Sequence, residues 1–537
     1  MKYGYVRPLN LVMGIALAIS SGACQKESSD ADISPPTPAP LPACPIDDGT
    51  WDALTKIMNA DRRDLDAPGR SIAVFDGEEI FHCAGMGRRQ PGSNEDMAAE
   101  TLYPIASVTK TLTAIGALQE VERGNLSLHD PITTFLPLDW EFWRSPERSA
   151  QITLDHLLSQ RAAIFDYLEI DGPDGKKALK NYVEGDLVDD WWVMNDPGVM
   201  FNYSNDNYVV AGRLLEIADG RYYSERMTED VLEPLLMERT FFNSEQVWED
   251  DDWAGAESYD WTGGPDSVPV DPDSYGNSWG RPAAYTWSNV EDLARLGQFL
   301  LRGDEGILSD DLREQMGEPH ADLLLPAPGV MAYGYGLFSD EGLQVDGGLL
   351  PEPVLYHTGD MPGYSSDLYL FPGRDLGIAV LTNQDFSHAS NEAIADIIAE
   401  LVEVPAVESR PDWDPAGQDL DAFVGTYADP INAGDLIVTV DGNRLKMDLP
   451  SVSSVRYNST LTLHSPDTFV MTFDGMRLFL TFIKDDEGEY RYARSRWFVW
   501  EREANDAPAA VATPRVALPP NARFETQGVL RTALKAR

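Results

Sequence analysis

The sequence predicts an α+β domain, with an antiparallel sheet flanked by helices, followed by a small all-β domain. Strand-like alternation occurs near both ends of residues 48–403, at 71–81 and 368–381, and helical spacing lies between them. We therefore expect an antiparallel sheet that takes strands from both ends of this segment. Residues 423–500 then alternate as short strands separated by turns, which is typical of a β-barrel or sandwich.

Within the first domain, spacing and turn residues predict each element. Apolar residues three and four apart predict helices, and Gly124 and Gly220 stand where two of these helices should end. Residues 250–282 are crowded with Asp, Gly, Pro and Trp, and such a long loop is typical of the wall of a binding site. The expected elements are a helix at 51–63, a hairpin at 71–81, helices beginning near 108, 152 and 205, a helix at 290–301, strands at 353–356, 368–371 and 376–381, and a helix at 392–402.

Changes in composition set the expected boundaries along the chain. We expect an export signal at 1–24, a disordered tether at 25–47, the α+β domain at 48–403, a Pro-rich linker at 404–418, the β domain at 419–502 and a disordered tail at 503–537. Because the strands of the β domain look like a separate core, we expect a chain that ends near Val404 to fold without them.

The first residues resemble an export signal. An apolar run at 9–19 follows basic residues, is too short to span a membrane, and is followed by small residues before Cys24. This order is typical of a bacterial lipoprotein signal, in which Cys24 becomes the lipidated N-terminus, although Ser21 stands where leucine is usual. Cleavage after Ala23 without a lipid is the alternative. Both alternatives predict an exported protein, in the periplasm or as an outer-membrane lipoprotein of a bacterium.

The charge of the chain excludes some partners. Its 89 acidic and 41 basic residues give a net charge of -48, which argues against nucleic acid and against direct docking on anionic lipid. Membrane contact is therefore expected only through a lipid at Cys24. In an oxidising compartment Cys44 and Cys83 either form a disulfide or remain reduced.

The strongest chemical signal is Ser107 followed by Lys110. If this stretch opens a helix, residues three apart share one face, so the lysine amine can lie beside the serine hydroxyl. A free hydroxyl is a poor nucleophile, and a neutral lysine at hydrogen-bonding distance can take its proton. The pair is therefore a candidate nucleophile and base. An exposed serine and lysine on a surface helix is the alternative for this motif taken alone.

A second motif, Tyr203-Ser204-Asn205, precedes the helix expected near 205. A phenol placed there can relay a proton between lysine, serine and a leaving group, and the amide can bind a substrate carbonyl. Alternatively, the asparagine is only a helix cap. The same spacing recurs at 275–277, but no helix is expected after it, so Tyr203 is preferred.

The third motif is His357-Thr358-Gly359, which follows the strand expected at 353–356. The glycine would let a substrate backbone approach closely. Imidazole, with an unperturbed pKa of about 6.5, is expected to carry a full positive charge only at mildly acid pH.

The order of these three motifs resembles the serine β-lactamase and penicillin-binding protein superfamily, closest to its class C-related branch of D-aminopeptidases, DD-peptidases and family VIII-type esterases. The resemblance covers roughly residues 50–402, and the segment from Phe423 is similar to the lipocalin-like domain that often follows. It implies a β-lactamase/transpeptidase-like fold. Four further stretches also look like family segments, at 102–107, 152–158, 333–337 and 367–383.

The resemblance also assigns roles to residues. Ser107 would form an acyl-enzyme, Lys110 and Tyr203 would move the proton, and His357 would assist by hydrogen bonding or charge. Substrate contacts would come from Asn205, Thr358 and Gly359, and the oxyanion would be held by the backbone N–H groups of Ser107 and Asp360.

Two departures from the family pattern affect these roles. Asp360 places a carboxylate near a developing oxyanion, which it would repel unless the side chain points away. His357 stands where typical β-lactamases have lysine, and members with His-x-Gly tend toward aminopeptidase or esterase action.

We therefore expect a serine hydrolase that acts on a small peptide, amide or ester, including D-amino-acid or β-lactam-like compounds, without a metal or organic cofactor. One alternative is a non-catalytic protein that binds or senses cell-wall peptides on the same scaffold. Another is an α/β-hydrolase-type esterase that uses Ser278, because residues 276–280 fit Gly-x-Ser-x-Gly. The oligomeric state is left open.

Overall fold

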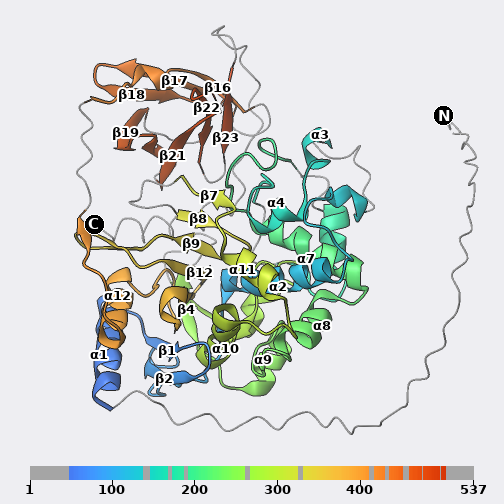
Figure 1. Ribbon diagram of the computed structural model, residues 1–537, viewed down its shortest axis with the longest axis vertical. Helices are drawn as coiled ribbons and strands as arrows, with labels where there is room; N and C mark the ends of the chain where they lie inside the picture. The colour runs from blue at the N-terminus through green and yellow to red at the C-terminus, as the bar shows by residue number, and fades with distance from the viewer. Residues whose placement is uncertain are drawn as a thin grey trace, which may run out of the picture. The chain divides into compact units, whose positions relative to one another are not determined.

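The computed structural model (Figure 1) describes most of the chain between Asp48 and Glu503. The described residues are 48–136, 146–166, 172–186, 192–259, 267–324, 331–409, 417–429, 434–451, 459–473, 476–485, 487–495 and 498–503. The expected signal, tether and tail, with Cys24 and Cys44, lie outside them. The chain divides into units 1–41 and 42–537, and everything below concerns the second unit.

The centre of the fold is an eight-stranded sheet in the order β2-β1-β14-β13-β12-β9-β8-β7, with antiparallel neighbours throughout. Ile72 of β1 lies opposite Val380 of β14, so strands from the two ends of the segment are paired. Its strands are β1 (Gly69–Phe75), β2 (Ile80–Gly87), β7 (Ala321–Asp322), β8 (Met331–Tyr333), β9 (Phe338–Asp340), β12 (Val354–Met361), β13 (Tyr364–Phe371) and β14 (Leu376–Thr382). This arrangement confirms the predicted α+β class.

Helices cover both faces of this sheet. Ile72 and Val74 face a core that they share with α1 and α12, which lie side by side in Figure 1, whereas Ala73 and Phe75 face the core of α2, α7 and α10. The helices are α1 (Asp48–Asp64), α2 (Thr109–Glu122), α3 (Pro146–Ser149), α4 (Leu154–Leu158), α5 (Ala178–Asn181), α7 (Asn205–Asp219), α8 (Tyr223–Met227), α9 (Ser244–Asp250), α10 (Val290–Arg302), α11 (Asp310–Gly317) and α12 (Asn391–Leu401).

Short strands form three smaller sheets, which pair β3 (Tyr103–Pro104) with β6 (Trp287–Ser288), β4 (Ala256–Tyr259) with β5 (Ser267–Val270), and β11 (Gly348–Leu350) with both β10 (Leu343–Val345) and β15 (Glu408–Ser409). The stretch 250–282 was expected to be an irregular loop. It instead contains the β4–β5 pair and a 3₁₀ turn at Pro272–Tyr275, so that expectation is wrong for its described residues.

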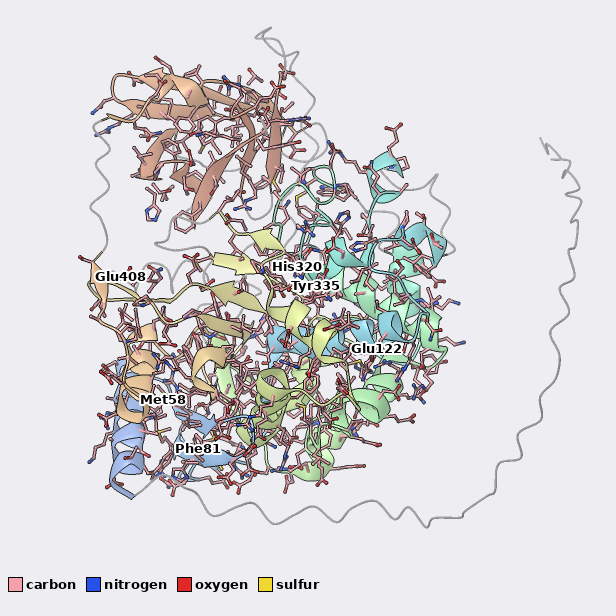
Figure 2. All side chains as sticks on the ribbon, in the orientation of Figure 1. Met58, Phe81, Glu122, His320, Tyr335 and Glu408 are labelled. Atoms are coloured by element: carbon pink, nitrogen blue, oxygen red, sulfur yellow. The ribbon has the colours of Figure 1, made fainter. Side chains whose placement is uncertain are left out.

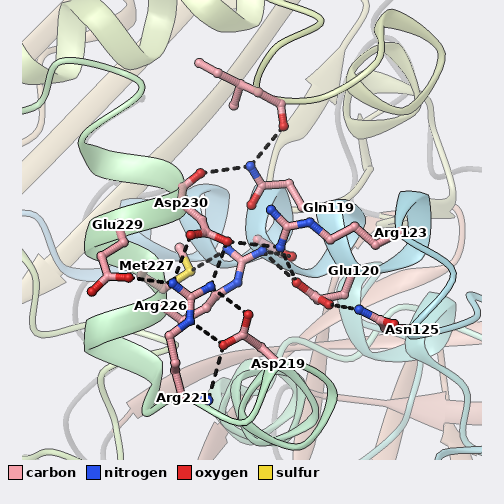
Figure 3. A network of polar contacts seen from close by, with 12 residues as sticks. Gln119, Glu120, Arg123, Asn125, Asp219, Arg221, Arg226, Met227, Glu229 and Asp230 are labelled. Carbon is pink, nitrogen blue, oxygen red and sulfur yellow. Dashed lines mark hydrogen bonds and ion pairs between the residues drawn. The ribbon is translucent and has the colours of Figure 1, made fainter. Parts of the chain in front are cut away.

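Helix α2 is buried from Thr109 to Glu120, as expected of a helix packed on every side. Its C-terminal end is held by the network in Figure 3, where Arg226 of α8 lies 3.0 Å from the Glu120 carboxylate and both side chains are fully buried. Asn125 Nδ2 donates to the same carboxylate at 2.8 Å, and Arg123 pairs with it at 2.6 Å. Because several donors share the charge, the buried carboxylate is compensated and the helix is fixed.

The segment 333–337 packs against the N-terminal turn of α2. Gly336 has a φ of 75°, and a Cβ there would lie 2.9 Å from the backbone oxygen of Lys110, so only glycine allows this approach. Tyr335 Oη donates to Asp155 Oδ1 of α4 at 2.8 Å, and the ring of His320 stacks on Tyr335 with 4.0 Å between centroids (Figure 2).

The C-terminal part is a closed barrel whose buried residues include Phe423, Tyr427, Phe482 and Trp500. Its strands are β16 (Gly425–Ala428), β17 (Leu436–Asp441), β18 (Arg444–Asp448), β19 (Thr460–Ser465), β20 (Thr468–Phe473), β21 (Met476–Lys484), β22 (Tyr490–Arg494) and β23 (Val499–Arg502). A closed eight-stranded barrel confirms the predicted all-β, lipocalin-like part.

The barrel core is not independent of the first domain. Phe165 and Trp192 belong to the same buried cluster as the barrel residues, and Met200 packs with Ile483, Tyr492 and Val499. A chain that ends near Val404 would expose these apolar side chains. The barrel thus covers part of the apolar surface of the first domain, and its independent folding stays a prediction.

Arg494 of β22 is buried where the barrel meets the first domain. Its Nη1 donates to the Phe201 carbonyl at 2.8 Å, its Nη2 donates to the Leu323 carbonyl at 2.7 Å, and burial lowers the pKa of Arg494 to about 10. Replacing Arg494 with methionine removes the donor from both carbonyls and leaves the buried Leu323 carbonyl without it, so we expect a loss of about 2 kcal/mol in the free energy of unfolding.

Urea unfolding would measure this loss, with Arg491→Met as the matched control on the same strand. Arg491 is 46% exposed and pairs with Glu501 at the surface, so its loss should change stability by less than about 1 kcal/mol. Equal stabilities of the two variants would contradict the prediction.

Two smaller findings concern membranes and thiols. Among the described residues, no helix has both the length and the apolar character needed to cross a bilayer. Cys83 is half-buried with its Sγ 3.3 Å from Glu291 Oε1. Because Cys44 lies outside the described residues, its pairing with Cys83 stays a prediction.

Candidate active site

Ser107 and Lys110 lie together at the start of α2. Ser107 is in the 3₁₀ turn Ala106–Val108, and Lys110 Nζ, fully buried, lies 2.9 Å from Ser107 Oγ. Ala106 has a φ of 46°, a left-handed conformation that costs about 1–2 kcal/mol for an L-residue. The turn is held because the Ser366 hydroxyl donates to the Ile105 carbonyl at 2.7 Å. Such local strain is typical of functional sites.

Lys110 also contacts an amide and a backbone carbonyl. Its Nζ donates to Asn205 Oδ1 at 2.7 Å and to the Ala283 carbonyl at 2.9 Å. Asn205 begins α7, and its backbone N–H and Nδ2 donate to Asp166 Oδ1 at 3.0 and 3.2 Å. Both ends of the Asn205 amide are therefore engaged within the protein, which ties the lysine to Asp166. A substrate contact for Asn205 stays a prediction.

Tyr203 lies next to the lysine, whose Nζ is 4.9 Å from the centre of its ring. The following turn is held by Gln160 Oε1, which accepts from Ser204 N at 2.9 Å and Asn207 Nδ2 at 2.6 Å. The competing motif at 275–277 is placed elsewhere, since Tyr275 is buried and its hydroxyl donates to the Pro362 carbonyl.

His357 is buried on β12 and neutral. Its Nδ1 lies 2.7 Å from the Thr358 carbonyl, which can only accept, so Nδ1 carries the proton and Nε2 accepts from the Tyr333 hydroxyl at 3.1 Å. Burial, together with the nearby Lys110, lowers the pKa of His357 to about 3. The expectation of a positively charged imidazole at mildly acid pH is therefore wrong.

This neutral state predicts the pH dependence of stability. Unfolded imidazole binds a proton near pH 6.5 but the folded one only near 3, so the stability that it contributes is present above 6.5 and is lost as pH falls toward 3. We expect the wild type to lose up to about 1.4 kcal/mol per pH unit in this window relative to His357→Gln. Urea unfolding of both proteins at pH 7 and pH 5 measures the difference. Parallel pH dependences would contradict a buried neutral His357.

Gly359 lets β12 approach the nucleophile turn. A Cβ at this position would lie 2.5 Å from the Ile105 carbonyl oxygen and 2.8 Å from Ser107 N. The glycine was expected to make room for a substrate backbone, but its hydrogen faces the protein's own backbone. The close approach places the strand beside the N–H of Ser107.

Thr358 and Asp360 lie on the opposite face of β12, because side chains alternate along a strand. The Asp360 carboxylate is 2.9 Å from His388 Nε2, and its other oxygen is 3.2 Å from Ser365 Oγ. The side chain thus points away from Ser107. This orientation meets the condition, stated from the sequence, under which Asp360 would not repel an oxyanion. Thr358 is half-buried on this face, and a substrate contact for it stays a prediction.

Ser278 is not on a nucleophile elbow. A 3₁₀ turn at Pro272–Tyr275 precedes it where a strand is required, and no described helix follows until α10. Its hydroxyl donates to Asp174 Oδ1 and accepts from Gly175 N at 3.0 Å. The alternative α/β-hydrolase site is therefore wrong.

Some residues of the site were missed from the sequence. Asp166 and the Ala283 carbonyl hold Asn205 and Lys110, and His388 pairs with Asp360. Tyr333, which donates to His357, had a signal, since it lies in the family-like segment 333–337. Within the part of the chain that the structure describes, no group of His, Cys, Asp or Glu side chains is arranged to hold a metal ion.

Comparisons with known proteins agree with this architecture. A family model described as Beta-lactamase matches residues 54–403. Protein flp of Staphylococcus aureus strain N315 is 27% identical over 337 residues, covering 62% of this chain and 62% of its own length, so the match spans less than two thirds of that relative. A Beta-lactamase of Yersinia enterocolitica is 24% identical over 360 residues, covering 62% of this chain and 87% of its own.

Solved structures of other proteins share the fold. The crystal structure of SurE with D-Leu has a TM-score of 0.61 at 21% identity and covers 85% of this chain and 100% of its own. The D-amino acid amidase of Ochrobactrum anthropi SV3, complexed with L-phenylalanine amide, has a TM-score of 0.54 at 22% identity and covers 66% of this chain and 98% of its own. Since the family model spans more than half of the sequence, the chain belongs to the Beta-lactamase family.

Proposed function

We propose that this protein is an exported serine hydrolase that cleaves an amide or ester of a D-amino acid through an acyl-enzyme on Ser107. The observation that carries the proposal is the contact of Lys110 Nζ with Ser107 Oγ at 2.9 Å. This pair lies within residues 54–403, which match the Beta-lactamase family model. The substrate class is supported by the fold neighbours, one a D-amino acid amidase and the other solved with D-leucine.

The partners of Lys110 explain how it acts as the base. A neutral amine has two N–H donors and one lone pair. Asn205 Oδ1 and the Ala283 carbonyl, at 2.7 and 2.9 Å, take the two donors. The lone pair is then directed at the Ser107 hydroxyl, whose proton it removes as the oxygen attacks the substrate carbonyl.

The remaining steps follow from neighbouring groups. The oxyanion accepts from the backbone N–H groups of Ser107 and Asp360. Tyr203, beside Lys110, passes the proton to the departing amine or alcohol. A water molecule, deprotonated by the same pair, then attacks the acyl-enzyme carbonyl and releases the acid and Ser107.

His357 bears on the choice of substrate. As a neutral imidazole whose N–H is donated to the Thr358 carbonyl, it offers neither a charge nor a free donor to a substrate carboxylate, so the strong attraction of a lysine in its place is missing. Neutral amides and esters lose little from this change. We therefore propose weak turnover of β-lactams relative to D-amino-acid amides and simple esters.

The function is tested on the purified protein with a fluorophosphonate probe and a substrate panel. We expect one probe adduct, located by mass spectrometry on the peptide that contains Ser107. D-alanine p-nitroanilide and a p-nitrophenyl ester should be hydrolysed faster than the L-anilide and a chromogenic cephalosporin. A folded protein without adduct and without turnover would overturn the proposal and favour a non-catalytic peptide-binding role.

The proposed location has its own test. If Cys24 carries a lipid, the wild-type protein should sediment with membranes, whereas Cys24→Ser should remain unprocessed or appear in the soluble fraction. Recovery of all wild-type protein from the soluble periplasm would contradict a lipid anchor and favour cleavage after Ala23.

A further inference from the structure

A histidine lies between two carboxylates behind the strand of the predicted oxyanion site. His388 Nε2 is 2.9 Å from Asp360 Oδ2 on β12, and His388 Nδ1 is 2.7 Å from Asp367 Oδ1 on β13. Their side chains are 9% exposed for His388, 29% for Asp360 and 0% for Asp367. Asp367 lies opposite Thr358 in the β12–β13 pairing, so the two carboxylates occupy the same face of the sheet.

The geometry assigns the charge of His388. Ionised carboxylates accept hydrogen bonds and donate none, so both ring nitrogens must carry protons for both contacts to form. Burial opposes the charged form, but the attraction of Asp360 and Asp367 outweighs it and raises the pKa of His388 well above 6.5. His388 is therefore an imidazolium cation at neutral pH.

The loop between β14 and α12 holds this cation in place. Arg70 Nη2 of β1 donates to the Ser387 carbonyl at 2.8 Å, and Ala389 N donates to Asp367 Oδ2 at 3.0 Å. The other charged groups packed around the loop are Asp61 of α1, which pairs with Arg70, and Asp385, which accepts from Gly363 N.

The His388 cation lies against β12, the strand that carries Gly359 and Asp360. Gly359 brings β12 against Ser107 N, and Asp360 is the next residue along it. On the proposed function, Asp360 supplies an N–H to the oxyanion and carries a carboxylate on the same residue. Without a counter-charge, that carboxylate would oppose the negative charge that develops in the transition state.

We infer that His388 is a positioning residue of this hydrolase, which turns the Asp360 carboxylate away from the oxyanion and neutralises it. The inference rests on the proposed function. No general base, nucleophile or substrate contact is assigned to His388, since it acts only through Asp360.

The test compares His388→Ala with two double variants that each neutralise one of the carboxylates it pairs with. His388→Ala should lower kcat for the D-anilide about tenfold to a hundredfold, with little change in KM. Adding Asp360→Asn removes the unpaired charge at the oxyanion and should restore most of the lost kcat. Adding Asp367→Asn should not restore kcat.

Stability separates this role from simple packing. Asp367 is fully buried, so its unpaired carboxylate carries the larger desolvation cost. Urea unfolding should therefore show that Asp367→Asn rescues the stability of His388→Ala better than Asp360→Asn does. The opposite pattern is expected for kcat, and a merely structural histidine would not produce it.

Two results would overturn the inference: unchanged kcat in a folded His388→Ala protein, or recovery of kcat by Asp367→Asn but not by Asp360→Asn. If His388→Ala does not fold, His388→Gln, which keeps one hydrogen bond, replaces it in the same comparison. Loss of all activity in the wild type would instead refute the proposed function, so the two failures are distinguishable.

Discussion

Replacing Ser107 with alanine is expected to abolish hydrolysis and labelling by a fluorophosphonate. The hydroxyl beside Lys110 Nζ, at 2.9 Å, is the atom that would form the acyl-enzyme, and alanine has no atom to replace it. Removing a nucleophile of this kind lowers kcat by about 10,000-fold or more. The loss should occur without unfolding, because Ser107→Ala removes only the hydroxyl oxygen from a turn that backbone contacts already hold.

Ser278→Ala is the matched control, since Ser278 is also a serine with a hydrogen-bonded hydroxyl. It should retain most of the activity and all of the labelling. A stability measurement on each variant separates loss of chemistry from loss of fold. If Ser278→Ala were inactive and Ser107→Ala active, the assignment of the nucleophile would be refuted.

The sequence was sufficient for the parts of the fold that depend on local spacing. Lys110 reaches Ser107 because i and i+3 share a helix face, and the strands at both ends of the first domain pair as expected. The closed barrel follows from alternation between turns. These features depend on neighbours along the chain, which a sequence shows directly.

Features that depend on distant contacts were not predictable. The charge of His357 is set by its burial, together with the nearby Lys110. A sequence pattern does not show how deeply a histidine will be buried. Arg494 contacts carbonyls of Phe201 and Leu323, 293 and 171 positions away, and backbone carbonyls give no sequence signal. The barrel looked like a separate core because the sequence does not show that Phe165, Trp192 and Met200 of the first domain pack against it.

The site shows the same division. His388 lies 28 positions from Asp360 and 21 from Asp367, with no motif spacing, and only the register of β12 with β13 brings the two carboxylates to one histidine. The sequence did indicate that the Asp360 carboxylate is unfavourable near an oxyanion, but it did not indicate that His388 pairs with it.

Replacing Gly359 with alanine is expected to lower the rate strongly, though less than the loss of Ser107. The new methyl group would lie 2.5 Å from the Ile105 oxygen and 2.8 Å from Ser107 N, and neither is the end of a flexible side chain. Either β12 or the nucleophile turn must move, and a displacement of about 1 Å at a catalytic group can cost about 100-fold in rate. We expect kcat and the rate of labelling to fall together by at least about that factor.

Gly373→Ala is the matched control for this variant. Gly373 lies in the turn between β13 and β14, and the only described atom close to a Cβ there is Glu352 Oε1 at 3.9 Å. This variant should leave both rates unchanged and shows that an added methyl group in the sheet region is tolerated where space exists. If Gly359→Ala kept the labelling rate and raised only the KM for the D-anilide, the glycine would serve substrate approach, as first expected from the sequence. The contact between β12 and the Ser107 turn would then not be what fixes the geometry of the nucleophile.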